Sequence, residues 1–126
     1  MAADRRGVSG NPDPRPPRRH VASRREWAVL RDAKLKPPCR GCQRSGALWL
    51  ELHHLVGRDL GGDDCAPNLI PLCSRPAGDG CHEVYEKRMT GWRAISASIR
   101  MALEHDELAY VLERKGEDFL VRYYPL

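Results

Sequence analysis

The sequence predicts an α+β fold in which a short β-hairpin is followed by a helix and flanked by further helices. Three observations lead to this prediction. Leucines alternate with other residues in 48–55, apolar residues recur with helical spacing in other segments, and two cysteine pairs bracket the region of the hairpin. The chain has 126 residues, of which only 6% are aromatic. We therefore expect one domain with a small core that needs additional cross-links, and its five cysteines could provide either disulfides or a metal site.

Positive charge is concentrated near the N-terminus. Residues 1–44 hold 12 Lys and Arg against 4 Asp and Glu, whereas residues 45–126 hold 9 against 13. Residues 1–20 contain four prolines and few apolar side chains, which predicts a disordered basic arm ahead of one domain at 21–126. Such an arm either binds a polyanion or serves only as a solvated tail.

The first helix is expected directly after this arm. Ser23-Arg24-Arg25-Glu26 has the form of a capping box, and Pro37-Pro38 ends the helix. The core of the domain, at about 37–90, then begins with Cys39-Arg40-Gly41-Cys42. This tetrapeptide predicts a tight turn in which Gly41 adopts a positive φ.

The hairpin and its helix are expected next. Residues 48–55 (LWLELHHL) alternate as a strand does, and residues 57–67 (GRDLGGDDCAP) have the Gly and Asp content of a loop. Residues 69–72 (LIPL) predict a second strand, placed at an edge because Pro71 has no N–H to donate. A helix is expected over 82–89.

The C-terminal segment, 91–126, is predicted to be helical. Asp106 is expected to cap a second helix of this segment, Gly116 to end it, and 119–123 to form a last turn. The first helix of the segment is indicated by apolar residues that recur on one face, namely Trp92, Ile95, Ile99 and Leu103.

Four cysteines have the pattern of a zinc site. Two residues separate Cys39 from Cys42, and Cys73 and Cys81 form the natural second pair, although seven residues separate them. Cys65 is a rival for the fourth position, and we treat it as a free thiol. The sequence shows neither an apolar signal segment nor a run long enough to span a membrane, which predicts a reducing cytoplasm and metal binding rather than disulfides. The alternative is that these cysteines are small buried hydrophobic residues.

Histidines are interleaved with the cysteines in a definite order. His53-His54 follows the first pair, Asn68 comes next, and Cys81-His82 closes a series that spans 39–82. This order resembles the HNH endonucleases, in particular the small phage-type members with four cysteines, over roughly 27–90. The resemblance implies a ββα-metal core stapled by a structural Zn²⁺ ion. It also implies a metal-dependent endonuclease that hydrolyses phosphodiester bonds, nicking or cutting duplex DNA.

The resemblance implies a role for each polar residue of the series. His54 matches the general base, and Asn68 matches the residue that orients this base. His53 and His82 match ligands of a catalytic divalent ion such as Mg²⁺ or Mn²⁺, and Glu86, one helical turn after His82, matches a third ligand. In an ideal strand, neighbouring histidines point to opposite faces, so both can serve one phosphate only where the strand ends or bulges.

Each of these residues also has a plainer interpretation. The two histidines can be a chance surface pair, Asn68 a turn residue, His82 a fifth candidate zinc ligand or a helix cap, and Glu86 a solvated side chain. The alternative function is accordingly a non-catalytic zinc module that binds nucleic acid or protein. The second histidine favours the nuclease, because a hydrolase needs a base as well as a metal ligand.

The expected partner is double-stranded DNA, bound mainly through its phosphates and not at a membrane. The resemblance also implies a role in phage DNA packaging beside a terminase or another packaging protein, in the bacterial host cell if the chain is phage-encoded. Five arginines of the first helix, the cysteine turn and the loop after the histidines are expected to contact DNA, namely Arg24, Arg25, Arg31, Arg40 and Arg58.

Overall fold

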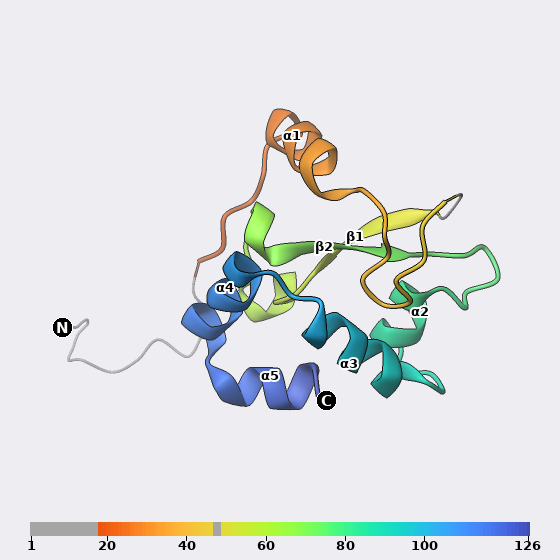
Figure 1. The fold of residues 1–126 in the computed structure, drawn as a ribbon. Helices are drawn as coiled ribbons and strands as arrows, with labels where there is room; N and C mark the ends of the chain where they lie inside the picture. The colour runs from red at the N-terminus through yellow and green to blue at the C-terminus, as the bar shows by residue number, and fades with distance from the viewer. Residues whose placement is uncertain (1–17, 47–48) are drawn as a thin grey trace.

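The computed structural model describes residues 18–46 and 49–126, and these form the predicted α+β fold. Most of the predicted arm and the first residue of the predicted first strand lie outside the described residues. In chain order the elements are α1 (Arg24–Lys34), β1 (Leu50–His54), η1 (Arg58–Leu60), η2 (Ala66–Asn68), β2 (Leu69–Cys73), α2 (Cys81–Glu86), α3 (Trp92–Met101), α4 (His105–Lys115) and α5 (Glu117–Tyr123). The β-hairpin lies in the middle of the molecule, with α1 on one side and α3, α4 and α5 on the other (Figure 1).

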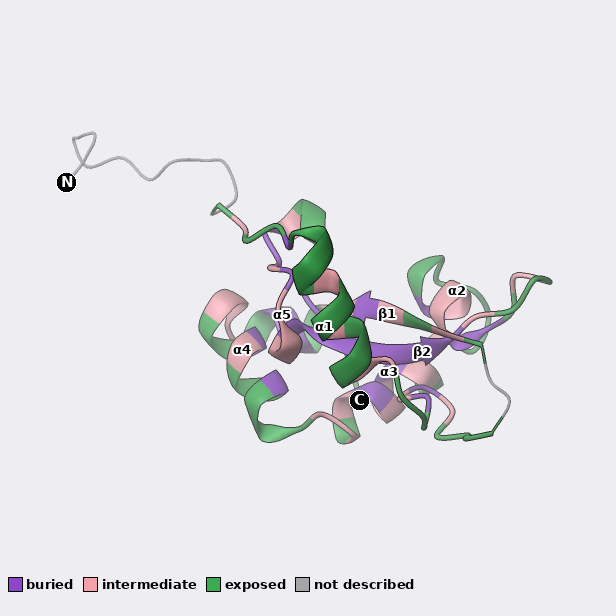
Figure 2. Ribbon diagram, turned by 90° about the horizontal axis from the view of Figure 1, so that it is seen from above, coloured by how far each residue is buried: buried purple, intermediate pink, exposed green. Residues whose placement is uncertain are grey.

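The hairpin is antiparallel, and its two strands pair along their whole length. Leu50 lies opposite Cys73 at one end, and His54 lies opposite Leu69 at the other. Every residue of β2 is buried, whereas in β1 only His53 is buried (Figure 2). The sheet therefore faces the interior mainly through its second strand, and β1 carries its histidines at the end that leads into the loop at 55–68.

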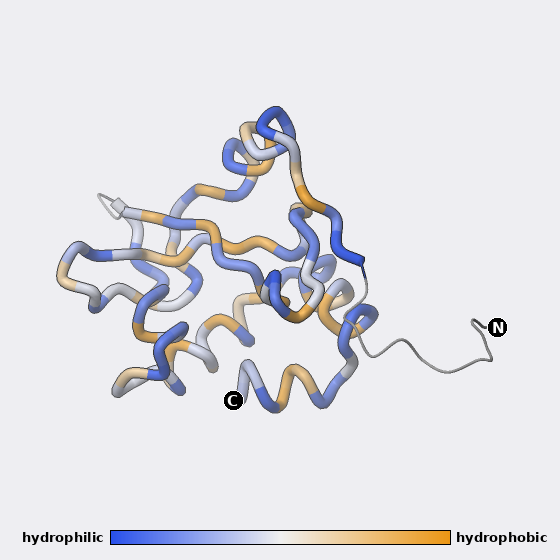
Figure 3. The backbone as a smooth tube through the Cα atoms, turned by 180° about the vertical axis from the view of Figure 1, so that it is seen from behind, coloured by the Kyte–Doolittle hydropathy of each residue, from blue (hydrophilic) through white to orange (hydrophobic). Residues whose placement is uncertain are grey.

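The core lies between the hairpin and the helices α2 to α5. The apolar face predicted for α3 is confirmed: Ile99 is fully buried, and Trp92, Ile95 and Leu103 pack against the core. Burial of a side chain such as Ile99 contributes about 1.5–3 kcal/mol. Hydrophobic residues run along β2 in the middle of the molecule, while the helices around it mix both kinds of residue (Figure 3). Beyond Ile99, the core contains Leu55, Val56, Ile70, Leu72, Tyr85, Val111, Phe119, Leu120 and Tyr124.

The helix starts agree with the sequence in one case and differ in another. The predicted capping box of α1 is present, with Ser23 Oγ accepting from the amide of Glu26 at 3.1 Å and the Glu26 carboxylate accepting from the amide of Ser23 at 2.8 Å. The predicted cap of α4 is wrong, because Glu104 rather than Asp106 precedes the helix. The amide of Glu104 donates to Glu107 at 2.8 Å, so the inward-facing carboxylate of Glu107 completes this helix start.

The turn at the first cysteine pair requires glycine for a reason other than the predicted one. The positive φ in this turn belongs to Gln43, at 62°, and not to Gly41. A Cβ atom at Gly41 would lie 2.8 Å from the Cβ and 2.9 Å from the Sγ of Cys81. The missing side chain of Gly41 thus allows the turn to lie directly against α2, and this close contact brings the two cysteine pairs together.

Candidate functional site

The four cysteines of the predicted zinc site lie together. The sulfur atoms of Cys39, Cys42, Cys73 and Cys81 are all within 4.8 Å of one another, and this thiol cluster is largely buried. Zn–S bonds of about 2.3 Å place the sulfurs of a tetrahedral site about 3.8 Å apart, which is close to this arrangement. The thiol cluster can therefore hold a metal ion and is compatible with structural zinc. Cys65 is not part of it.

Backbone amides favour the thiolate form in this cluster. The amides of Gly41 and Cys73 donate to Cys39 Sγ at 3.3 and 3.2 Å, and the amide of Cys81 donates to Cys73 Sγ at 3.4 Å. A hydrogen bond from the Cys81 thiol, and then the amides of the turn and of Cys73, lower the pKa of Cys39. Burial raises the pKa of Cys73, and the neighbouring Cys39 raises that of Cys81, so without a metal ion the thiolate is concentrated on Cys39. Since metal ligation needs thiolates, the turn and the start of α2 are arranged as a zinc site requires.

A second group of possible ligands joins the end of β1 to α2. His53, His82 and Glu86 each offer one ligand atom within 4.8 Å of the others, and we call them the histidine cluster. The ring centroids of the two histidines are 5.4 Å apart, and His53 Nδ1 lies 3.5 Å from Glu86 Oε2. Two imidazoles and a carboxylate are ligands that a divalent cation accepts. The three residues predicted as ligands of a catalytic ion are thus neighbours in space.

Hydrogen bonds determine which nitrogen of His53 is free. The hydroxyl of Tyr124 donates to the carbonyl of Leu55 at 2.6 Å, and the same oxygen lies 3.0 Å from His53 Nε2. Because a phenol has a single O–H, its oxygen must accept from Nε2–H of His53. Nδ1 then keeps its lone pair on the side of Glu86. Burial first, and then the charges of His82 and His54, hold the pKa of His53 well below its usual value, so this ring is neutral.

His82 of α2 is oriented by a carboxylate of strand β1. Its Nδ1 lies 2.8 Å from Glu51 Oε1. A carboxylate only accepts, so Nδ1 carries a proton and Nε2 is the nitrogen left for coordination. This contact is the carboxylate–histidine arrangement that commonly supports metal ligands. Neither Glu51 nor Tyr124 was expected from the sequence, because a carboxylate on a strand and an aromatic residue far along the chain carry no pattern of their own.

The ring of His54 is hydrogen-bonded to Asp64, in the loop between the two strands. Its Nε2 lies 2.8 Å from Asp64 Oδ1, and its side chain is 13% exposed. Burial lowers the pKa of His54, and the bond to Asp64 opposes this effect without cancelling it. His54 is nevertheless the last residue of β1, and it lines one cavity of about 260 Å³ together with His53 and Glu86. Both neighbouring histidines therefore border a common space at the strand end.

Asn68 is fully buried and holds the loop that follows the histidines. Its Oδ1 accepts from the amide of Val56 at 2.8 Å, and its Nδ2 donates to the carbonyls of Val56 and Asp63 at 3.0 and 2.9 Å. The amide of Leu55 donates to the carbonyl of Asn68 at 2.8 Å. Asn68 thus fixes the backbone directly after His54, and its side-chain amide makes all of these hydrogen bonds within the loop.

Three of the arginines expected to bind DNA line one groove. Arg24, Arg31 and Arg58 border a groove of about 790 Å³ between α1 and β1, and His82 of the histidine cluster borders it as well. The guanidinium of Arg58 lies 5.5 Å from the ring centroid of Trp27 in the same groove. Arg25 borders a different hollow, on the side of His20 and Ala66.

Arg40 has a different environment from the one expected. Its two terminal nitrogens lie 2.7 and 2.9 Å from the buried carboxylate of Glu107, and Nη1 also donates to the carbonyl of Ala102 at 3.1 Å. Lys34 contacts the same carboxylate at 2.7 Å. The guanidinium of Arg40 is thus engaged within the protein by a bidentate ion pair.

Comparison of the chain with models of protein families, with curated proteins and with solved structures gives no match. Among the described residues, no helix has both the length and the apolar character that crossing a bilayer demands.

Proposed function

We propose that this chain is a metal-dependent DNA endonuclease of the HNH type. One observation supports the proposal above all: His53 from the hairpin and His82 and Glu86 from α2 come together, and a third imidazole, His54, borders the same cavity as His53 and Glu86. The order hairpin then helix corresponds to a ββα-metal core. The thiol cluster at the other end of the hairpin would hold the structural zinc ion.

The histidine cluster would hold the catalytic ion through His53, His82 and Glu86. When bound, Mg²⁺, Mn²⁺ or a similar ion supplies positive charge to the scissile phosphate and to the oxygen that leaves it. His53 and His82 have one ring nitrogen each engaged by Tyr124 and Glu51, so each keeps the other nitrogen for coordination. The lowered pKa of His53 keeps its ring neutral, as ligation requires.

His54 would act as the general base. Its Nε2–H is engaged by Asp64, so Nδ1 is the nitrogen that accepts a proton from the attacking water. The water oxygen forms a bond to phosphorus, the bond from phosphorus to the 3′ oxygen breaks, and this oxygen takes up a proton from solvent. The lowered pKa of His54 keeps the ring unprotonated at neutral pH, which suits this role.

The groove between α1 and β1 would hold the DNA backbone. Arg24, Arg31 and Arg58 provide positive charge along it, and His82 links it to the histidine cluster. Contacts of this kind bind phosphates without reading the base sequence. We therefore propose duplex DNA as the substrate with little sequence preference of its own. A terminase or another packaging protein would then direct the cut, and a phage-encoded enzyme would work in the bacterial host cell.

The test is nicking of supercoiled plasmid by the full chain with Mg²⁺ or Mn²⁺. We expect cutting that EDTA stops and that His54→Ala reduces by at least about 100-fold. His105→Ala, which removes an exposed histidine at the start of α4, serves as the matched control and should cut at the parent rate. A purified, zinc-loaded protein that binds DNA but never cuts it would instead indicate the non-catalytic zinc module.

A further inference from the structure

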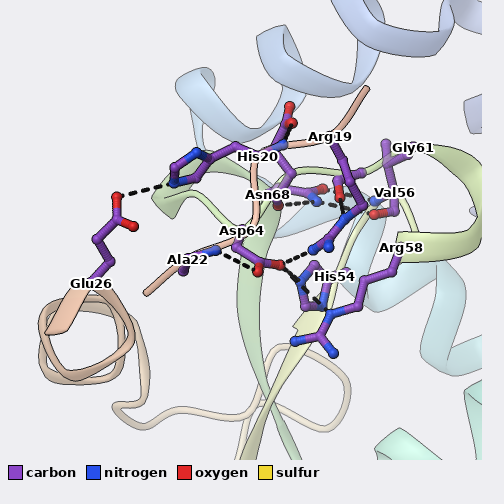
Figure 4. A network of polar contacts seen from close by, with 12 residues as sticks. Arg19, His20, Ala22, Glu26, His54, Val56, Arg58, Gly61, Asp64 and Asn68 are labelled. Atoms are coloured by element: carbon purple, nitrogen blue, oxygen red, sulfur yellow. Dashed lines mark hydrogen bonds and ion pairs between the residues drawn. The ribbon is translucent and has the colours of Figure 1, made fainter. Parts of the chain in front are cut away.

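Asp64 is a buried carboxylate that contacts the proposed general base, His54. It lies in the loop between the two strands and is 3% exposed. Donors surround it on several sides: Arg19 pairs with Oδ1, the amide of Ala22 donates to Oδ2 at 2.9 Å, and Arg58 Nε lies 3.6 Å from Oδ1 (Figure 4). Burial alone would raise the pKa of Asp64, but the hydrogen bonds and these positive charges hold it below its ordinary value.

The contact with His54 is the one that bears on chemistry. Asp64 Oδ1 lies 2.8 Å from His54 Nε2, and an ionised carboxylate can only accept at this distance. The ring is therefore held as the tautomer with the proton on Nε2 and the lone pair on Nδ1. A histidine without this partner would be free to turn and to carry its proton on either nitrogen.

We propose that Asp64 is the positioning residue of His54, and this inference rests on the proposed nuclease function. Asp64 fixes the orientation of the ring and the nitrogen that is left to accept a proton from water. It does not contact the substrate itself. This arrangement uses the same physical logic as an acid–base pair in which a buried carboxylate holds a histidine as one tautomer.

The N-terminal side of the domain supports Asp64 from behind. Arg19 Nε donates to the carbonyl of Gly62 at 2.7 Å, and the amide of Asp64 donates to the carbonyl of His20 at 2.9 Å. The last residues of the predicted arm thus lie against the loop and surround the carboxylate. Arg19, a residue of the predicted basic arm, thus compensates the charge of Asp64 within the protein.

The first experiment compares Asp64→Asn with the parent in plasmid nicking at saturating DNA. An amide at this position can donate to Nε2 and so favour the wrong tautomer, and we expect the maximal rate to fall at least about 100-fold while the KM for DNA stays unchanged. Asp64→Glu should restore part of the rate. Asp63→Asn is the matched control, because Asp63 also accepts from the N-terminal segment, at 2.6 Å from the amide of His20, and makes no contact with His54 in the described structure.

A merely structural role for Asp64 predicts different results. Asp63→Asn would then cut as slowly as Asp64→Asn, and adding Asp64→Asn to His54→Ala would lower the residual cutting rate further. If Asp64 acts through His54, the second substitution has no effect in the His54→Ala background. Equal cutting by Asp64→Asn and the parent would overturn the inference.

A second measurement does not depend on cutting. Long-range ¹H–¹⁵N spectra of His54, recorded where the ring is neutral, should show the proton on Nε2 in the parent and a mixture of tautomers in Asp64→Asn. Absence of nicking by the parent would refute the proposed nuclease. The tautomer of His54 would still test the contact with Asp64, and a parent ring protonated on Nδ1 would disprove it.

Discussion

The hydroxyl of Tyr124 lies 3.0 Å from Nε2 of His53 and donates its own proton to the carbonyl of Leu55. One aromatic side chain after α5 thereby fixes the proton of a histidine at the end of β1. The contact also ties the C-terminal helices to the histidine cluster, because Tyr124 is fully buried and stacks on Tyr85 of α2 at 5.2 Å between ring centroids. The C-terminal helices thus contribute to the candidate site itself, because they position Tyr124 against His53.

Tyr124→Phe should weaken both the fold and the binding of the second ion. The substitution leaves the carbonyl of Leu55 and Nε2 of His53 without a partner in the interior, which costs about 1–3 kcal/mol of unfolding free energy. His53 also loses the bond that reserves Nδ1 for coordination. Urea unfolding and calorimetric titration with Mn²⁺ measure the two effects. Tyr123→Phe, at the neighbouring half-buried position, is the control, and equal losses in both variants would contradict the assigned role.

Glu51→Gln should lower metal affinity with little change in stability. Glu51 is exposed, and its contact with His82 Nδ1 at 2.8 Å orients a ligand rather than filling the core. Loss of such a carboxylate partner typically reduces affinity 10- to 100-fold, by about 1.4–2.7 kcal/mol. Mn²⁺ titration checks this value, and Glu113→Gln, an exposed substitution on α4, is the comparison. Unchanged affinity in Glu51→Gln would mean that His82 is not a ligand or needs no support.

Glu107 should make stability depend on acid pH. Burial alone would raise its pKa, but hydrogen bonds from Arg40, Lys34 and the amide of Glu104 hold the pKa below its ordinary value of 4.5. A lowered pKa in the folded state means that the stabilisation is complete above about pH 4.5 and disappears as the pH falls through the folded-state pKa. Glu107→Gln should thus cost about 3 kcal/mol at pH 7 and clearly less at about pH 3.5.

Thermal unfolding of both proteins at the two pH values measures this difference. Loss of zinc in acid affects both proteins alike and cancels in the comparison. Glu104→Gln is the matched control, because Glu104 is largely exposed and lies 3.7 Å from the same Arg40, where an ion pair contributes little. A cost of Glu107→Gln that stays constant with pH would show that the charge of Glu107 is not what stabilises the fold.

Cys42→Ser should remove the bound zinc and unfold the domain. The small core leaves the four sulfurs to connect the turn at 39–42, the end of β2 and the start of α2. Elemental analysis should give about one zinc ion per parent chain and none in the variant, and circular dichroism should show loss of cooperative unfolding. Cys65→Ser should keep both its zinc and its fold. A stable and active Cys42→Ser protein would exclude a structural zinc ion at this cluster.

The sequence predicted the local parts of the molecule well because they depend on local patterns. Alternating leucines indicated β1, a capping box indicated α1, and paired cysteines indicated the thiol cluster. The partners of the three histidines were not predicted. Glu51 of β1 contacts His82 of α2, Asp64 contacts His54 from the loop, and Tyr124 contacts His53 from the far end of the domain. None of the three belongs to a spaced motif.

Charged residues were the other source of error. Arg40 was expected to meet DNA, but it lies against Glu107, a partner 67 positions away in the chain. Arginine binds a phosphate and a buried carboxylate equally well, because its guanidinium offers the same fork of N–H donors to either group. Only the three-dimensional fold decides which of the two it meets. Gly41 is a similar case. Glycine is required there because a side chain would collide with Cys81, and not because of the backbone angles of Gly41 itself.

The register of the short hairpin decides which of the two neighbouring histidines, His53 or His54, faces α2. Its strands pair over five positions, with Cys73 at one end and His54 at the other. A slip of one position would swap the two faces of β1, sending His53 toward the loop carboxylate and His54 toward α2. A zinc ion bound by both Cys42 and Cys73 would tie the segment that leads into β1 to the end of β2 and so oppose that slip. In such a small sheet, the structural zinc ion would help to keep the register. The register in turn determines that His53 is the proposed metal ligand and His54 the proposed base.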